Sequence, residues 1–283
     1  MITQSVIAIT LIGIVITGLI PIIGGIALLA MGKIKASSFW AGVLAYIIGI
    51  IASSIVSVII TFATTDMSAM SSASAVPEAS MSTTIIVSVI TGLLMALSMG
   101  VCVKSCMKTR TFNAALSCGL GFGAAHAVTA AMGLVTIYTT FASINSGAFD
   151  MMYANSVKMG IMTKETVAAL KAVYTGYTPI TIINVSLTNL FFAAAMAAAA
   201  VFIMRFVCSG KAFIGICSAM GTLVLCSIGS AIPNAVAAII VTAAIGIAAL
   251  IFAIRIKGDV IPPEKKAVAD PFLSSVENAK NDE

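Results

Sequence analysis

The stretch PITIINVSLTNLFFAAAMAAAAVFIM, residues 179–204, runs without a charged side chain and is long enough to cross a bilayer as a helix. A transmembrane helix needs roughly 20 predominantly apolar residues to span a hydrocarbon core of about 30 Å. Six other stretches share this character, and each is a continuous apolar run, which favours helices over a lipid-facing β-barrel. The sequence therefore predicts an all-α fold, a polytopic membrane helical bundle with about seven transmembrane helices. The predicted spans cover residues 5–32, 39–64, 83–103, 114–140, 179–204, 212–230 and 232–254.

Composition supports this class, because 60% of the 283 residues are hydrophobic and only 9% are charged. The basic residues indicate the orientation, since short cytoplasmic loops retain Lys and Arg. Twelve of the fifteen follow the first, third, fifth and seventh predicted spans, whereas the opposite side has only Lys158, Lys164 and Lys171. This pattern predicts an N-terminus outside the cell membrane and a cytoplasmic C-terminus. The net charge of +5 is thus a topology signal, and we expect no nucleic-acid binding.

Ionisable side chains are nearly missing from the predicted spans, since no Asp or Glu falls in them and His126 is the only basic residue. Ionisable groups within a bilayer are costly and usually mark proton relays, ion pathways or catalysis. His126 is therefore the one candidate for a catalytic or metal-binding residue. It is also consistent with a proton carrier or a hydrogen-bonded packing residue, and the lack of a carboxylate or second His at the same depth favours packing.

The sequence around His126, CGLGFGAAHA at residues 118–127, is the most specific local pattern in the chain. Gly119, Gly121, Gly123 and Ala127 have the small-residue spacing that lets another helix approach closely. They do not form a dinucleotide-binding fingerprint, because the glycines lie within an apolar helix and no strand precedes them. We therefore predict a helix-packing surface here and no cofactor-binding residues.

Uncharged polar side chains recur in three of the predicted spans and are candidates for the lining of an internal cavity. Such a cavity would recognise a lipid headgroup, a peptide segment or a transmembrane helix through hydrogen bonds. Alternatively, these groups hydrogen-bond between helices and hold the bundle together. The candidates are His126, Thr129, Asn184, Thr188, Asn189, Ser218 and Thr222.

Two segments differ in character from the spans. In the outer segment 141–178, Thr163 can cap a helix that begins at Lys164, which predicts an amphipathic helix over about 163–177 that lies on the outer membrane surface or caps the bundle. Residues 257–283 are polar, charged and interrupted by prolines, which predicts a disordered cytoplasmic tail after a helical domain of residues 1–256.

The segment GLGFGAAHA, which follows RTFNAAL at residues 110–116, resembles the YhfC-type intramembrane metalloproteases, a family of the PrsW and CAAX-protease group. The corresponding stretch of that family reads approximately Gly-x-Gly-His-Gly-x-x-Glu-Ala. Residues 21–49 resemble the first hairpin of the family, and residues 179–205 resemble a later span. The resemblance implies a shared membrane scaffold and, if the protease site is complete, a zinc ion.

The chain departs from the family pattern at the expected catalytic positions. Phe122 and His126 stand where the family has His and Glu, and residues 97–100, Leu-Ser-Met-Gly, stand where a Glu-Glu pair would close the third span. Metal-assisted hydrolysis needs ligands for the ion and a general base for the water, and one His with several amides does not supply both.

These observations predict a non-catalytic membrane scaffold or binding subunit with a YhfC-like fold. The alternatives are an active intramembrane metalloprotease, with His126 as its catalytic or zinc-binding residue, and an uncoupled permease or channel subunit. The expected partners are the lipid bilayer and another membrane protein or a second copy of the chain.

Overall fold

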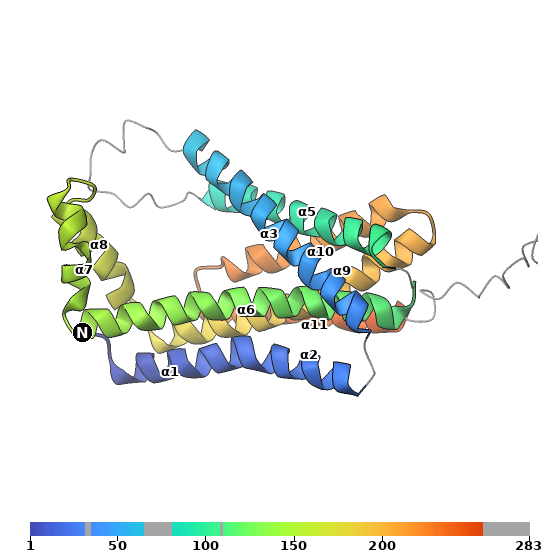
Figure 1. Ribbon diagram of the computed structural model, residues 1–283, viewed down its shortest axis with the longest axis horizontal. Coiled ribbons are helices and arrows are strands. Elements are labelled where there is room, and N and C mark those ends of the chain that lie inside the picture. Colours follow the sequence, from blue (N-terminus) through green and yellow to red (C-terminus); the bar gives the residue numbers. More distant parts are fainter. Residues whose placement is uncertain (32–34, 65–80, 108–109, 257–283) are drawn as a thin grey trace, which may run out of the picture.

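The computed structural model describes residues 1–31, 35–64, 81–107 and 110–256, and this part contains helices and no strands. Within these described ranges, seven helices are long and apolar enough to cross a membrane, which confirms the predicted all-α multi-pass class. Most of them run along the longest axis of the molecule, whereas α3 crosses α6 obliquely (Figure 1). The helices are α1 Gln4–Ile14 with α2 Ile20–Ala30, α3 Ala36–Thr64, α5 Met81–Ser105, α6 Phe112–Asn145, α9 Pro179–Cys208, α10 Ala212–Ser230 and α11 Ala235–Arg255.

The first span combines α1 and α2 through a short π turn, η1, at Val15–Leu19. In this turn the backbone N–H of Ile20 bonds to the carbonyl of Val15. Pro21 follows directly; it has no N–H, and in a regular α-helix its ring would clash with the carbonyl four residues earlier. The wider π turn is therefore the local response of the helix to Pro21.

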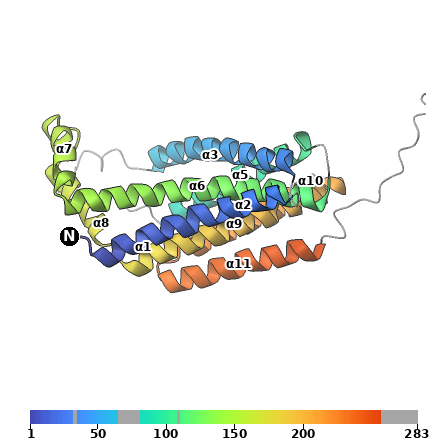
Figure 2. The ribbon, with the colours of Figure 1, turned by 60° about the horizontal axis from the view of Figure 1, so that its bottom comes forward.

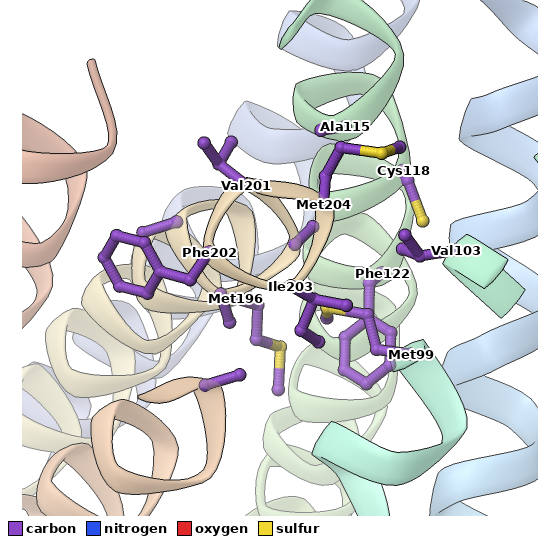
Figure 3. Packing of buried hydrophobic residues seen from close by; sticks show 14 of the residues in the cluster. Met99, Val103, Ala115, Cys118, Phe122, Met196, Val201, Phe202, Ile203 and Met204 are labelled. Atoms are coloured by element: carbon purple, nitrogen blue, oxygen red, sulfur yellow. The ribbon is translucent and has the colours of Figure 1, made fainter. Parts of the chain in front are cut away.

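Helix α9 is the centre of the bundle. Buried residues make up 56% of its most apolar window, against 22–39% for the other spans. Helices α6, α10 and α11 pack around it, and α3 and α5 complete the bundle on the far side of α6 and α10 (Figures 1 and 2). Figure 3 shows Met196 and Ile203 of α9 packed towards Phe122 of α6 and Met99 of α5.

The glycines before His126 allow α6 to lie between two helices at once. A Cβ atom built at Gly119 would lie 2.6 Å from the Ala197 Cα of α9, and one at Gly123 would lie 2.9 Å from the Ala193 carbonyl oxygen. On another face of α6, a Cβ at Gly121 would overlap the backbone of Phe39 in α3. Ala127, the fourth residue of the predicted packing surface, is also buried. The backbone of α6 is therefore in direct contact with that of α3 on one face and that of α9 on another.

Two short helices, α7 Ala148–Lys158 and α8 Lys164–Thr175, cover one end of the bundle, which we call the hairpin end (Figure 1). The Thr163 hydroxyl caps α8 by accepting a hydrogen bond of 3.1 Å from the Thr166 N–H. Hydrogen bonds from its own backbone N–H and from Thr163 lower the pKa of the Glu165 carboxyl. The amphipathic segment predicted at 163–177 is thus a helix in the structure, whereas α7 was not predicted.

A separate apolar cluster attaches the hairpin to the spans, and an ion pair joins its two helices, α7 and α8. Phe149 of α7 and Val167 of α8 pack with Val6, Phe141 and Ile182 from three spans. Lys171 donates to the Asp150 carboxylate at 2.7 Å. The predicted tail, 257–283, and the loop between α3 and α5, 65–80, lie outside the described residues.

Candidate functional site

A cavity of about 280 Å³ lies among α3, α5, α6, α9 and α10, near the middle of the bundle. Its lining carries hydroxyl, amide and imidazole groups on a largely apolar wall, and none of the lining residues is acidic or basic apart from His126. The lining residues are Tyr46, Ile50, Ser88, Thr91, Gly92, Met95, His126, Thr129, Ala130, Asn189, Phe192, Met196, Leu223 and Ser227.

His126 and Asn189 form the central polar pair of this cavity. The His126 Nε2 atom lies 3.1 Å from the Asn189 Oδ1 atom. The Asn189 Nδ2 group donates to the Val185 carbonyl at 2.7 Å, which fixes the amide with its oxygen towards the imidazole. Because that oxygen only accepts, Nε2 carries the proton and donates, and in the neutral imidazole Nδ1 is left as an acceptor.

Two aromatic rings hold the imidazole in place. The Phe192 ring centroid lies 5.0 Å from that of His126, and the Tyr46 centroid lies 5.9 Å away at 72°. Tyr46 also packs edge-on against Phe122, with 5.3 Å between ring centroids. The position that the family pattern would give to a metal-binding His is thus occupied by a buried Phe122 ring, which supports Tyr46 and lines no part of the cavity.

Hydroxyl groups surround this pair. The Ser227 hydroxyl of α10 donates to the Ser88 oxygen of α5 at 3.0 Å, so the two helices are linked across the cavity wall. The Thr129 hydroxyl donates to the Ala125 carbonyl at 3.1 Å and also interacts with Tyr46. The site is therefore rich in uncharged groups that both donate and accept.

The structure brings together three of the seven residues predicted to line a cavity, namely His126, Thr129 and Asn189. The other four lie outside its lining. At about 100° per residue, Asn184 is turned about 140° from Asn189 and Thr188 about 100°. Ser218 and Thr222 are likewise turned about 180° and about 140° from Ser227 on α10.

Three of these four residues carry hydroxyls, and each hydroxyl donates a hydrogen bond within its own helix. Thr188 donates to Asn184 at 2.7 Å, Ser218 to Ile214 at 2.9 Å and Thr222 to Ser218 at 3.0 Å, in each case to a backbone carbonyl. Asn184 differs, because its buried Oδ1 atom has no hydrogen-bond partner among the described residues. For three of the four, the structure therefore supports neither cavity lining nor a hydrogen bond to another helix.

Four polar residues of the cavity lining were not predicted: Tyr46, Ser88, Thr91 and Ser227. A weak signal for two of them exists in the sequence, since Ser88, Thr91 and Met95 follow the spacing of one helix face. Single hydroxyl residues are common in transmembrane helices, so hydropathy alone does not separate them from lipid-facing positions.

The donor set does not fit the zinc ion that the family resemblance implies. Zinc prefers three or four thiolate, imidazole or carboxylate ligands. Within the described ranges, no group of three or more His, Cys, Asp or Glu residues could hold a metal ion. His126 is instead surrounded by an amide, hydroxyls and aromatic rings.

The fold and this site together define an integral, multi-pass α-helical membrane protein with an uncharged polar cavity. Comparison with known proteins adds no family, because no family model, curated protein sequence or solved structure matches the chain.

Proposed function

We propose that this chain is a non-catalytic binding subunit of the cell membrane, which recognises an uncharged group of its ligand in the cavity around His126. The observation that carries the proposal is the His126–Asn189 pair within an aromatic, uncharged wall. Such a wall binds through hydrogen bonds and shape, because an unpaired charge in this environment would not be compensated.

The same groups argue against hydrolysis. An intramembrane metalloprotease needs an ion to activate water and a general base to accept its proton. The chain has a single imidazole, which cannot both hold the ion and act as the base, and its Nε2–H is already donated to the Asn189 amide. If the YhfC resemblance reflects common descent, this chain has kept the scaffold of that family and replaced the catalytic groups.

A comparison of purified proteins tests this function. Wild type, His126→Ala and Ser218→Ala would be purified in mild detergent without a chelating tag, and analysed for metal content and by native mass spectrometry. Ser218 is the matched control, since it lies outside the cavity and bonds within α10. We expect no stoichiometric metal in any of the three, and a bound molecule in wild type and Ser218→Ala that His126→Ala loses. Stoichiometric zinc lost only in His126→Ala would overturn the proposal in favour of the protease.

The proposal also includes the orientation, with the hairpin end outside the cell. Lys104 and Arg205 lie at the opposite end of the bundle. Because Lys and Arg are enriched on the cytoplasmic side of membrane proteins, we assign this end to the cytoplasm. In a variant without native cysteines, Cys at the exposed position Asn155 of α7 should react with a membrane-impermeant maleimide on intact cells. Cys at the exposed position Lys104 should react only after the cells are opened. The reverse labelling pattern would invert the orientation.

A further inference from the structure

A strip of small and polar residues leads from the cavity along α6 towards the hairpin end. The strip consists of Thr129, Gly133, Thr136 and Thr140, which follow each other at the spacing of one helix face. Thr129 is part of the cavity lining, so the strip and the cavity are continuous. Thr129, Gly133 and Thr136 are exposed, and Thr140 is half-buried.

No described part of the chain covers the middle of the strip. A Cβ atom built at Gly133 would meet nothing within 4 Å. The neighbouring Val128, Met132 and Val135 are exposed by 40%, 66% and 43%. Figure 1 shows the reason, because α3 crosses α6 near the end opposite the hairpin and diverges from it towards the hairpin end. The described helices therefore leave this face of α6 uncovered, so that lipid can reach it in a bilayer.

The strip suits an alkyl chain. The Thr129, Thr136 and Thr140 hydroxyls each donate to a carbonyl of their own helix, at 3.1, 3.0 and 2.8 Å. Their donors are thus satisfied without a ligand, and an apolar chain laid over them would leave no hydrogen-bond donor unpaired. The open space at Gly133 allows such a chain to lie close to the backbone.

The cavity sets the chemistry of the group at the end of that chain. Its volume of about 280 Å³ corresponds to about nine molecules of liquid water at about 30 Å³ each, which suits a compact group. It lies near the middle of α6, far from both helix ends, and a charged headgroup would have to leave the interface to reach it. An uncharged hydroxyl, in contrast, both donates and accepts, and matches the Ser88 and Ser227 hydroxyls and the free acceptor of His126.

We infer that the ligand is a neutral, single-chain lipid alcohol, whose hydroxyl enters the His126 cavity and whose alkyl chain lies along Thr129, Gly133, Thr136 and Thr140. This inference rests on the proposed binding function and specifies its ligand class and its entry route. Entry is lateral, from the lipid beside α6.

Three probes with the same chain test the ligand class. The full-length protein in nanodiscs would be exposed to hexadecane, hexadecanol and palmitate, each with a photoactivatable diazirine in the chain. We expect hexadecanol to bind about fivefold more tightly than hexadecane, because its hydroxyl gains one net hydrogen bond. Palmitate should bind least. Cross-links of the hexadecanol probe should map to residues 128–140. Equal binding of all three probes, or cross-links elsewhere, would overturn the inference.

Two glycine variants test the route. Gly133→Leu fills open space on the strip, and we expect it to weaken hexadecanol binding about tenfold, which corresponds to about 1.4 kcal/mol. Gly24→Leu is the matched control, because a Cβ at Gly24 on α2 also meets nothing within 4 Å. Thr136→Phe should block the strip in the same way. If His126→Ala abolishes binding while Gly133→Leu and Thr136→Phe do not, the cavity function holds and the route is wrong. If His126→Ala leaves hexadecanol binding unchanged, the proposed function itself fails.

Discussion

Residues 112–127 and 128–145 form two halves of the same helix, α6, and both are rich in small side chains, but these side chains face different surroundings. In the first half, Gly119 and Gly123 contact α9 and Gly121 contacts α3 at backbone distance. In the second half, a Cβ built at Gly133 would meet nothing within 4 Å, and its neighbours on the strip, Thr129 and Thr136, are exposed. Small residues alone therefore do not indicate helix packing. They allow close approach, and the rest of the fold decides whether a helix or a lipid makes it.

The largest effect is expected from a substitution at Gly121, in the packed half of α6. A leucine there would place its Cβ within the backbone of Phe39, and backbone atoms cannot move aside as a flexible side chain can. Overpacking typically costs about 1–3 kcal/mol and occasionally more, and we expect Gly121→Leu to exceed this range and to prevent assembly of α3 on α6. Fluorescence-detected size-exclusion chromatography should show little monodisperse protein. A normal elution profile and an unchanged Tm would show that the contact between α3 and α6 is loose.

A smaller effect is expected at the boundary between the two halves, where His126 lies. Asn189→Leu removes the acceptor of His126 Nε2–H and should lower the free energy of unfolding by about 1–3 kcal/mol, the typical cost of one unsatisfied buried group. His126→Phe combined with Asn189→Leu should recover part of this loss, because both polar partners are then gone. Denaturant unfolding of the two single variants and the double variant in detergent measures the coupling between the two residues. Strictly additive effects would mean that the 3.1 Å contact contributes nothing to stability.

The smallest effect on stability is expected in the second half of the helix. A leucine at position 133 has free space around it. Glycine in a helix interior is about 1 kcal/mol less favourable than good helix formers, so Gly133→Leu also removes this penalty. We therefore expect an unchanged or slightly raised Tm, in contrast to Gly121→Leu. A Tm lowered as far as that of Gly121→Leu would show that another part of the protein covers the strip.

The sequence predicted the fold class but only part of the site. The seven spans follow from uninterrupted hydropathy, a signal that tertiary contacts do not alter, and the α8 helix follows from the local Thr163 cap. Helix α7 has no such cap: it begins after Gly147, which has a positive φ of 79°, and its apolar residues are mixed with Asp150 and Asn155.

Which polar residues line the cavity depends on how each helix is rotated about its axis, and composition does not predict this rotation. Asn184 and Asn189 are close in sequence and of the same type, yet only Asn189 meets His126 because the two amides lie on different faces of α9. Tyr46 and Ser88 join the site only because α3 and α5 cross α6 and α10 at the matching height.

The length of α6 has a consequence for membranes of different thickness. Its 34 residues extend about 51 Å at about 1.5 Å per residue, whereas the hydrocarbon core is about 30 Å thick. Because α7 follows α6 after only Ser146 and Gly147, the length of α6 fixes the distance of the hairpin from the middle of the membrane. A thin bilayer would leave the exposed Met151 and Met152 clear of the lipid, and a thicker one would bring them to the headgroups.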